Sequence, residues 1–165
     1  MAPPKLEYLF KMKGYLAPDQ TVEVGTVKSG PQRIFAPIVS GWLEGPSVGR
    51  AEATPGGGDW MLVDPQSQTI HLDVRFCAKW EDGNAAFFHY PGIIQINEKV
   101  MKAMTYAPDA KSTEFEDLEF WTSPIVEISN KELKWLERSM LVAQGKLIHD
   151  DGGYGVEYEV YKLAH

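Results

Sequence analysis

Short runs of alternating apolar and polar residues, each closed by a turn signal, constrain the fold of this chain more than any other feature. The run KLEYLFKMKGYL, residues 5–16, alternates apolar residues with charged neighbours. A period of two residues is typical of a strand with one buried face. Further runs of this kind recur at short spacing, and pairs such as Gly45-Pro46 separate them. The pattern predicts an antiparallel β protein.

Three strands are expected in the middle of the chain, over residues 60–63, 70–80 and 85–90. Asp64-Pro65 and Asp82-Gly83 supply the turns between them. An Asp-Gly pair flanked by alternating apolar residues is a strong hairpin signal. This part of the chain is therefore predicted to be an antiparallel meander.

Helical periodicity is confined to residues 93–104, where Asn97 is placed to cap a short helix. Residues 131–140 fit either a helical turn or the start of a strand, and periodicity alone does not decide between them. Many strands, one short helix and no repeat of fixed length predict an all-β fold, either a sandwich or a closed or nearly closed antiparallel barrel.

Length and charge limit the organisation and the partners. The 165 residues fit one domain, residues 1–165, with a flexible N-terminus over 1–5. The formal charge of -7 and the scattered basic residues indicate no nucleic-acid partner. Cys77 is the only cysteine, which excludes an internal disulfide. The absence of a membrane-length apolar run or a secretory signal predicts no membrane contact and a cytoplasmic location.

The stretch HLDVRF, residues 71–76, carries the most informative polar row. His71, Asp73 and Arg75 share one side of the strand, and Leu72, Val74 and Phe76 share the other. If the polar row faces solvent, it is an ordinary strand surface with an ion pair. If it faces an enclosed interior, an acid, a base and a cation are placed together where they acquire chemistry.

Other motifs give weaker signals. Gly56-Gly57-Gly58 precedes a strand rather than a helix, so a close-approach turn that delivers Trp60 to a barrel mouth is favoured over a phosphate loop. His71, Asp73 and His89 form a conceivable metal cluster, but the signal is unspecific and no metal is expected. Ser40-Gly41 lacks the G-x-S-x-G context of a nucleophile elbow.

The aromatic residues admit two interpretations. Small β proteins fill their interiors with aromatic side chains, which is the simpler explanation. A lumen lined by aromatic rings and a few polar groups is also typical of a small-molecule site. The tryptophans concerned are Trp42, Trp60, Trp80, Trp121 and Trp135.

The order of several blocks resembles the family catalogued as domain of unknown function 3237. These blocks are GPQRIFAPIVSGWLEGP, GGGDW, HLDVRF, EDGNAAFFHYPG, FWTSP, WLE and VEYEVYKL. The resemblance implies a single antiparallel β-barrel, similar in architecture to allene oxide cyclase and dirigent proteins, that acts without cofactors on apolar metabolites. Trp121-Thr122 departs from the Arg-Thr pair of many members, so the pocket is expected to be more aromatic.

With the resemblance, the polar row of residues 71–76 is predicted to point into the lumen, where Arg75 would keep Asp73 ionised. One hypothesis is a cofactor-free cyclase or isomerase of secondary metabolism, with an aromatic or polyketide-derived substrate that closes an oxygen heterocycle. Asp73 or Glu44 would be its acid/base and Arg75 its oxyanion partner. The predicted substrate-binding residues are Trp42, Trp60, His71, His89, Trp121 and Glu127.

A second hypothesis is a binding module, either a carrier or a dirigent-type guide that orients an intermediate without moving protons. It needs the aromatic walls but not the ionisable row. Both hypotheses share an apolar or aromatic small molecule as partner, no cofactor and no metal, and a homodimer is possible in either case.

Overall fold

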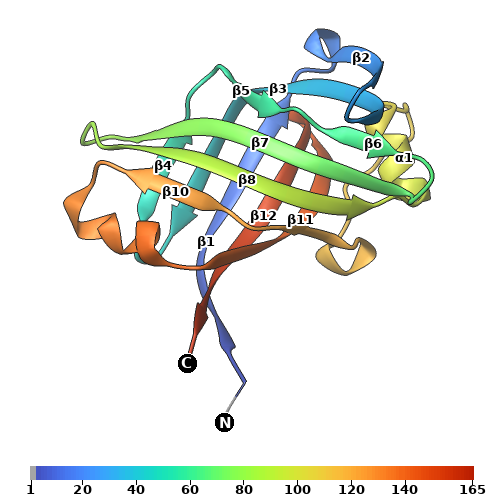
Figure 1. The fold of residues 1–165 in the computed structure, drawn as a ribbon. Helices are drawn as coiled ribbons and strands as arrows, with labels where there is room; N and C mark the ends of the chain where they lie inside the picture. Colours follow the sequence, from blue (N-terminus) through green and yellow to red (C-terminus); the bar gives the residue numbers. More distant parts are fainter. Residues whose placement is uncertain (1–2) are drawn as a thin grey trace.

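The computed structural model describes residues 3–165 as one antiparallel sheet that closes into a barrel (Figure 1). The strands are β1 (Lys5–Leu16), β2 (Val22–Val27), β3 (Gly30–Gly45), β4 (Gly49–Ala53), β5 (Gly57–Asp59), β6 (Leu62–Asp64), β7 (Thr69–Trp80), β8 (Ala85–Gln95), β9 (Phe120–Thr122), β10 (Ile125–Ile128), β11 (Leu141–Asp150) and β12 (Gly153–Ala164). The helical segments are α1 (Glu98–Met104) and the 3₁₀ turns η1 (Pro18–Gln20), η2 (Phe115–Asp117) and η3 (Lys131–Arg138).

The ring of strands runs β1–β3–β4–β7–β8–β9–β11–β12 and returns to β1. The short strands β4, β5 and β6 successively fill one position between β3 and β7, because each pairs with both of them. β2 extends the ring beside β3, and β10 extends it beside β8. Closure pairs the strands around the ring and encloses a lumen. The all-β barrel with one short α-helix is as predicted.

The lumen holds the apolar side chains of every strand in the ring. Leu72 and Val74 of β7 lie in this interior core beside Phe88 and Tyr90 of the adjacent strand β8. The helical segments contribute to the same core at two places, through the fully buried Val100 of α1 and through Leu133 and Leu136 of η3. Burial of these apolar surfaces is the main stabilising contribution to such a fold.

Turn chemistry places the longest hairpin where the sequence predicts it. Gly83 adopts a positive φ of 87° between β7 and β8, and its N–H donates to the carbonyl of Trp80 at 3.0 Å. Asn97 caps α1 as predicted, since its side chain accepts from the N–H of Val100. The helix is shorter than expected, because residues 93–95 continue β8.

Three other segments differ from the predictions or complete them. Residues 131–138 form the 3₁₀ segment η3, which resolves the ambiguity of that stretch in favour of a helical turn before β11. The predicted N-terminal tail lies partly outside the described residues, and β1 begins as early as Lys5. None of the helices within residues 3–165 combines the length and the hydropathy that crossing a membrane requires.

Candidate functional site

The polar row of β7 lies on the outer surface of the barrel, so the prediction that it points into the lumen is wrong. Leu72 and Val74 are only 6% and 3% exposed, whereas the side chains of Asp73 and Arg75 are 41% and 53% exposed. His71 is exposed as well. The apolar side of the strand fills the narrow interior, where a charged row would lose its hydration.

On the outside, Asp73 is the centre of a small ionic cluster. Its Oδ1 lies 3.2 Å from His89 Nε2 and 3.6 Å from Arg75 Nε. Arg75 and His89 are cross-strand partners in β7 and β8, which brings all three together. His71 does not complete the conceivable metal site, because no group of three or more His, Cys, Asp or Glu within residues 3–165 could hold a metal ion.

The other predicted acid also lies outside. Glu44 has a side chain that is 57% exposed and pairs with Arg50 at 3.2 Å. The Arg50 guanidinium in turn lies 5.0 Å from the centre of the Trp42 ring, so both predicted residues belong to a surface cluster on β3 and β4. Trp60 is 38% exposed and packs beside Phe35 with the ring centres 4.8 Å apart, rather than at the barrel mouth.

Trp121 and Glu127 complete the predicted set on the outer surface. Trp121 is 36% exposed and donates from Nε1 to Glu119 at 3.1 Å, and Glu127 occupies an exposed position of β10. None of the nine predicted site residues lines the cavities inside the barrel that are described below. A catalytic role for Asp73, Arg75 or Glu44 stays a prediction, and it would have to be exerted from outside the lumen.

Three cavities of decreasing size follow one another inside the barrel. The outermost has a volume of about 520 Å³ and opens between α1, the end of β1, β3 and the β11–β12 hairpin. A second cavity of about 50 Å³ lies deeper and shares four lining residues with the first. A third, of about 20 Å³, also shares four lining residues with the second, among them Tyr90 and Tyr158. The lumen therefore holds one large outer cavity and two small cavities that adjoin it in turn.

Asp59 is the acid that the fold places inside. It ends β5, where its neighbours across the strands are Ala36 of β3 and Val74 of β7, both buried. Its side chain is 8% exposed, lines the second cavity and accepts a hydrogen bond at 3.0 Å from the backbone N–H of Asp73. Burial raises the pKa of this carboxyl to about 7, although the hydrogen bond from the Asp73 backbone lowers it; the charge of Asp73 adds a smaller rise.

The position of Asp59 depends on the two glycines before it. A Cβ on Gly58 would lie 2.3 Å from a ring carbon of Phe35, and one on Gly57 would lie 2.6 Å from the carbonyl oxygen of Arg75. Only glycine therefore lets this short strand fit between β3 and β7. The glycine-rich stretch is a close-approach segment as predicted, but its consequence is an inward acid rather than an inward tryptophan.

Two buried tyrosines lie in the same cavity as Asp59. The rings of Tyr90 and Tyr158 pack edge to face with their centres 5.6 Å apart, and both residues are 2% exposed. Burial raises the pKa of each hydroxyl above its usual range, so both remain protonated. The charge of Asp59 adds to this rise in both tyrosines, so the three groups are electrostatically coupled.

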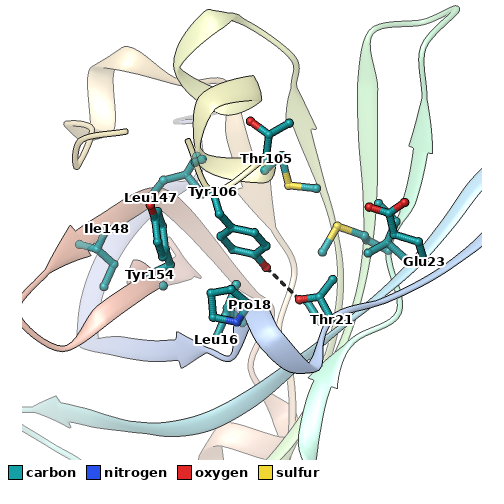
Figure 2. A pocket seen from close by; sticks show the side chains of 15 residues that line it. Leu16, Pro18, Thr21, Glu23, Thr105, Tyr106, Leu147, Ile148 and Tyr154 are labelled. Atoms are coloured by element: carbon teal, nitrogen blue, oxygen red, sulfur yellow. Dashed lines mark hydrogen bonds between the residues drawn. The ribbon is translucent and has the colours of Figure 1, made fainter. Parts of the chain in front are cut away.

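The mouth of the pocket carries most of its remaining polar groups (Figure 2). Tyr106, which follows α1, shares a hydrogen bond of 2.9 Å with Thr21, which follows η1. Glu23, Thr105 and Tyr154 also line this outer cavity. The residues of the outer and second cavities include no lysine, arginine or histidine.

Sequence reasoning missed Asp59, Tyr90 and Tyr158 as site residues. The one signal for Asp59 was the resemblance, since this residue belongs to the block GGGDW. Tyr90 ends a run whose alternate members Ala86 and Phe88 are apolar, which is the ordinary pattern of core positions. Only the closure of the ring shows that these positions converge on one cavity.

Comparison with known proteins places the chain in a family. The model of the family described as "Protein of unknown function (DUF3237)" matches residues 4–163. A relative from Penicillium roqueforti, named PR-toxin biosynthesis cluster protein 7, is 29% identical over 103 residues. The match covers 62% of this chain and 55% of that protein, so the chain spans about half the length of this curated relative.

Solved structures share the fold across nearly the whole chain. A β-barrel-like protein from Acinetobacter baumannii has a TM-score of 0.75 at 24% identity, with 99% of this chain and 98% of that chain covered. A structure described as an enzyme from Penicillium herquei has a TM-score of 0.58 at 13% identity, with 99% and 97% covered. At these identities the likeness shows the fold alone.

Proposed function

The chain belongs to the family described as protein of unknown function DUF3237, and from the acid inside its barrel we propose that it is a cyclase or isomerase of secondary metabolism. The observation that carries the proposal is the buried carboxyl of Asp59 in an apolar pocket with two tyrosine hydroxyls. A pKa of about 7 makes this carboxyl both an acid and a base near neutral pH.

The proposed reaction is the addition of a hydroxyl to an alkene within one aromatic or polyketide-derived molecule. The protonated carboxyl of Asp59 gives its proton to one alkene carbon, and the substrate hydroxyl oxygen bonds to the other carbon. The hydroxyl proton then returns to the Asp59 carboxylate. One C–O bond and one C–H bond form, the O–H bond and the alkene π bond break, and the mass is unchanged. No electron or group donor is needed, so the proposal includes no cofactor.

The pocket supports such a step in two further ways. An apolar lumen holds a flexible substrate in one conformer and excludes water from a cationic intermediate. The Tyr90 and Tyr158 hydroxyls belong to the same chamber as Asp59 and are the polar groups there that can contact the reacting end of the substrate. The name of the Penicillium roqueforti relative and the description of the Penicillium herquei structure as an enzyme support secondary metabolism and catalysis, respectively.

A carrier without catalysis is the second candidate. The observation that favours it is the size of the outer cavity, because about 520 Å³ is within the range of small-molecule sites and does not include Asp59. A carrier would bind its ligand there and make no use of the buried acid. The two candidates therefore differ in what Asp59 contributes.

The test is to incubate the purified protein with hydroxyaryl alkenes and hydroxy-enones and to follow each compound by liquid chromatography with mass detection. The expected result is a product of unchanged mass and changed retention time, and its formation should survive treatment with a chelator. Asp59→Asn should lower conversion by about 100-fold or more. Ligand affinity should stay within about threefold of wild type, since binding relies on apolar contact.

Conversion that persists at the wild-type rate in Asp59→Asn would remove the acid/base account. Ligand binding without conversion of any compound, in both the wild type and the variant, would favour the carrier.

A further inference from the structure

The two larger of these cavities adjoin each other at a junction, which we call the neck and define by the four residues that line both. These residues are Leu16, Met61, Met104 and Leu147. They come from β1, the β5–β6 connection, α1 and β11, so side chains from four different elements converge on the passage. The neck separates the mouth from the chamber that holds Asp59.

The volumes on the two sides of the neck differ about tenfold. The outer chamber, about 520 Å³, has room for the body of a drug-sized molecule. The inner chamber, about 50 Å³, has room only for a few atoms. A ligand that reaches Asp59 must therefore keep most of its bulk outside the neck and pass only a narrow end through it.

The polar groups are divided in the same way. The polar residues of the outer chamber are Thr21, Glu23, Thr105, Tyr106 and Tyr154. The inner chamber presents only Asp59 and the two tyrosines among apolar side chains. Because no basic side chain lines either chamber and Glu23 lies at the mouth, an anionic ligand would find no counter-charge.

From this arrangement we infer the substrate class: an uncharged molecule with a broad, hydroxylated body and one narrow apolar arm, selected by passage of the arm between Met61 and Met104. The inference rests on the proposed function, since it assigns the reacting group to the arm that reaches Asp59. Methionine suits this place because its unbranched side chain adapts to the group that passes.

Binding of neutral naphthol ethers tests the neck without requiring turnover. The probes share a hydroxynaphthalene body and carry a methyl, an n-propyl or a tert-butyl ether, and calorimetry measures each dissociation constant. Wild-type protein should bind the n-propyl probe about tenfold more tightly than the tert-butyl probe, in keeping with pocket discrimination by shape. A naphthoate with the n-propyl arm should bind at least about tenfold more weakly than the naphthol, since its charge has no partner.

Met104→Ala should widen the neck and reduce the discrimination between n-propyl and tert-butyl to about threefold or less. Met101→Ala is the matched control, because Met101 lies on the same helix, is 46% exposed and lines neither chamber. Met104→Trp should block the arm, so that the n-propyl and methyl probes bind equally. Thermal unfolding verifies that each variant is folded, and Met61→Ala replaces Met104→Ala if the latter is not.

If wild type, Met104→Ala and Met61→Ala all discriminate equally between the n-propyl and tert-butyl probes, the proposed selection at the neck is wrong. The proposed function is judged separately, because its readout is conversion. If Asp59→Asn loses conversion but the neck variants bind all probes as wild type does, the role of Asp59 is supported and the substrate class is rejected. If the neck variants change probe selectivity but Asp59→Asn converts substrate at the full rate, the substrate class is supported and the role of Asp59 is rejected.

Discussion

The backbone N–H of Asp73 donates to the side-chain carboxyl of Asp59 at 3.0 Å, so an outward acid on β7 fixes an inward acid on β5. The Asp73 side chain points to solvent while its main chain faces the neighbouring strand. Asp59 thereby has one oxygen held, and its carboxyl lines the cavity. Asp73 therefore lies on the surface, and Asp59 lies inside the barrel.

As the pH rises from about 4 to about 7, the free energy of unfolding of the protein should decrease because of Asp59. Its pKa in the folded protein, about 7, is raised from 3.8, so the folded state binds the extra proton in that interval. The stabilisation by this extra proton is fully present below pH 3.8, the pKa in the unfolded state. It is lost as the pH rises through 7, at about 1.4 kcal/mol per pH unit at most. Asp59→Asn should remove this dependence, which urea unfolding at pH 5 to 8 measures. Parallel curves for the two proteins would show that the carboxyl is not buried as described.

Removal of one buried hydroxyl should affect conversion more than stability. Tyr90→Phe or Tyr158→Phe keeps the edge-to-face packing but deletes the hydroxyl of a residue that lines the cavity. Conversion should fall about tenfold, and the free energy of unfolding should change by less than about 1.5 kcal/mol. Tyr8→Phe on the outer surface is the control, since Tyr8 is 43% exposed. A drop in stability that accounts for the whole loss of activity would assign these hydroxyls a purely structural role.

The hydrogen bond between Thr21 and Tyr106 should couple the two sides of the mouth. Thr21→Val and Tyr106→Phe each delete one partner of the 2.9 Å contact. Unfolding of the two single variants and the double variant should give a coupling energy of about 1 kcal/mol. Additive effects would mean that the hydrogen bond does not form in solution.

Glycines in the barrel should differ sharply in their tolerance of a methyl group. A Cβ on Gly145 would lie 2.7 Å from the ring of Phe120, which is fully buried, whereas one on Gly14 would lie 3.7 Å from its nearest neighbour, Ile38. Gly145→Ala should therefore destabilise the protein by about 1–3 kcal/mol, as overpacking does. Gly14→Ala, the matched control, should cost little, and similar losses of thermal stability in both would contradict the packing described here.

The alternation of residues predicted the architecture well because it reports a local property. The hairpin at Gly83 depends on a turn pair and its flanking strands, and the helix cap at Asn97 depends on neighbours a few positions away. Such signals are present in any short window of the sequence. Closure of the ring was expected from the resemblance to a barrel family.

The position of the site required contacts between distant segments. Alternation showed that Asp73 and Leu72 face opposite sides, but the resemblance to a barrel that holds its ligand led to the polar side being assigned to the interior. Asp59 lies in a three-residue strand after glycines, too short for a periodic pattern, and its burial depends on pairing with Ala36 and Val74. The convergence of Tyr90 and Tyr158 likewise depends on two strands far apart in the chain.

The rate of conversion in Asp59→Asn, measured beside Asp73→Asn, tests the central claim most directly. The two substitutions make the same chemical change at two neighbouring acids, one inside the lumen and one outside. The backbone N–H of Asp73 donates to the Asp59 carboxyl, so the substitutions leave this donor in place. We predict that Asp59→Asn lowers kcat by about 100-fold or more, as loss of an acid/base group does, and that Asp73→Asn stays within about threefold of wild type. A large loss in Asp73→Asn with full activity in Asp59→Asn would contradict the account and place the chemistry on the outer surface.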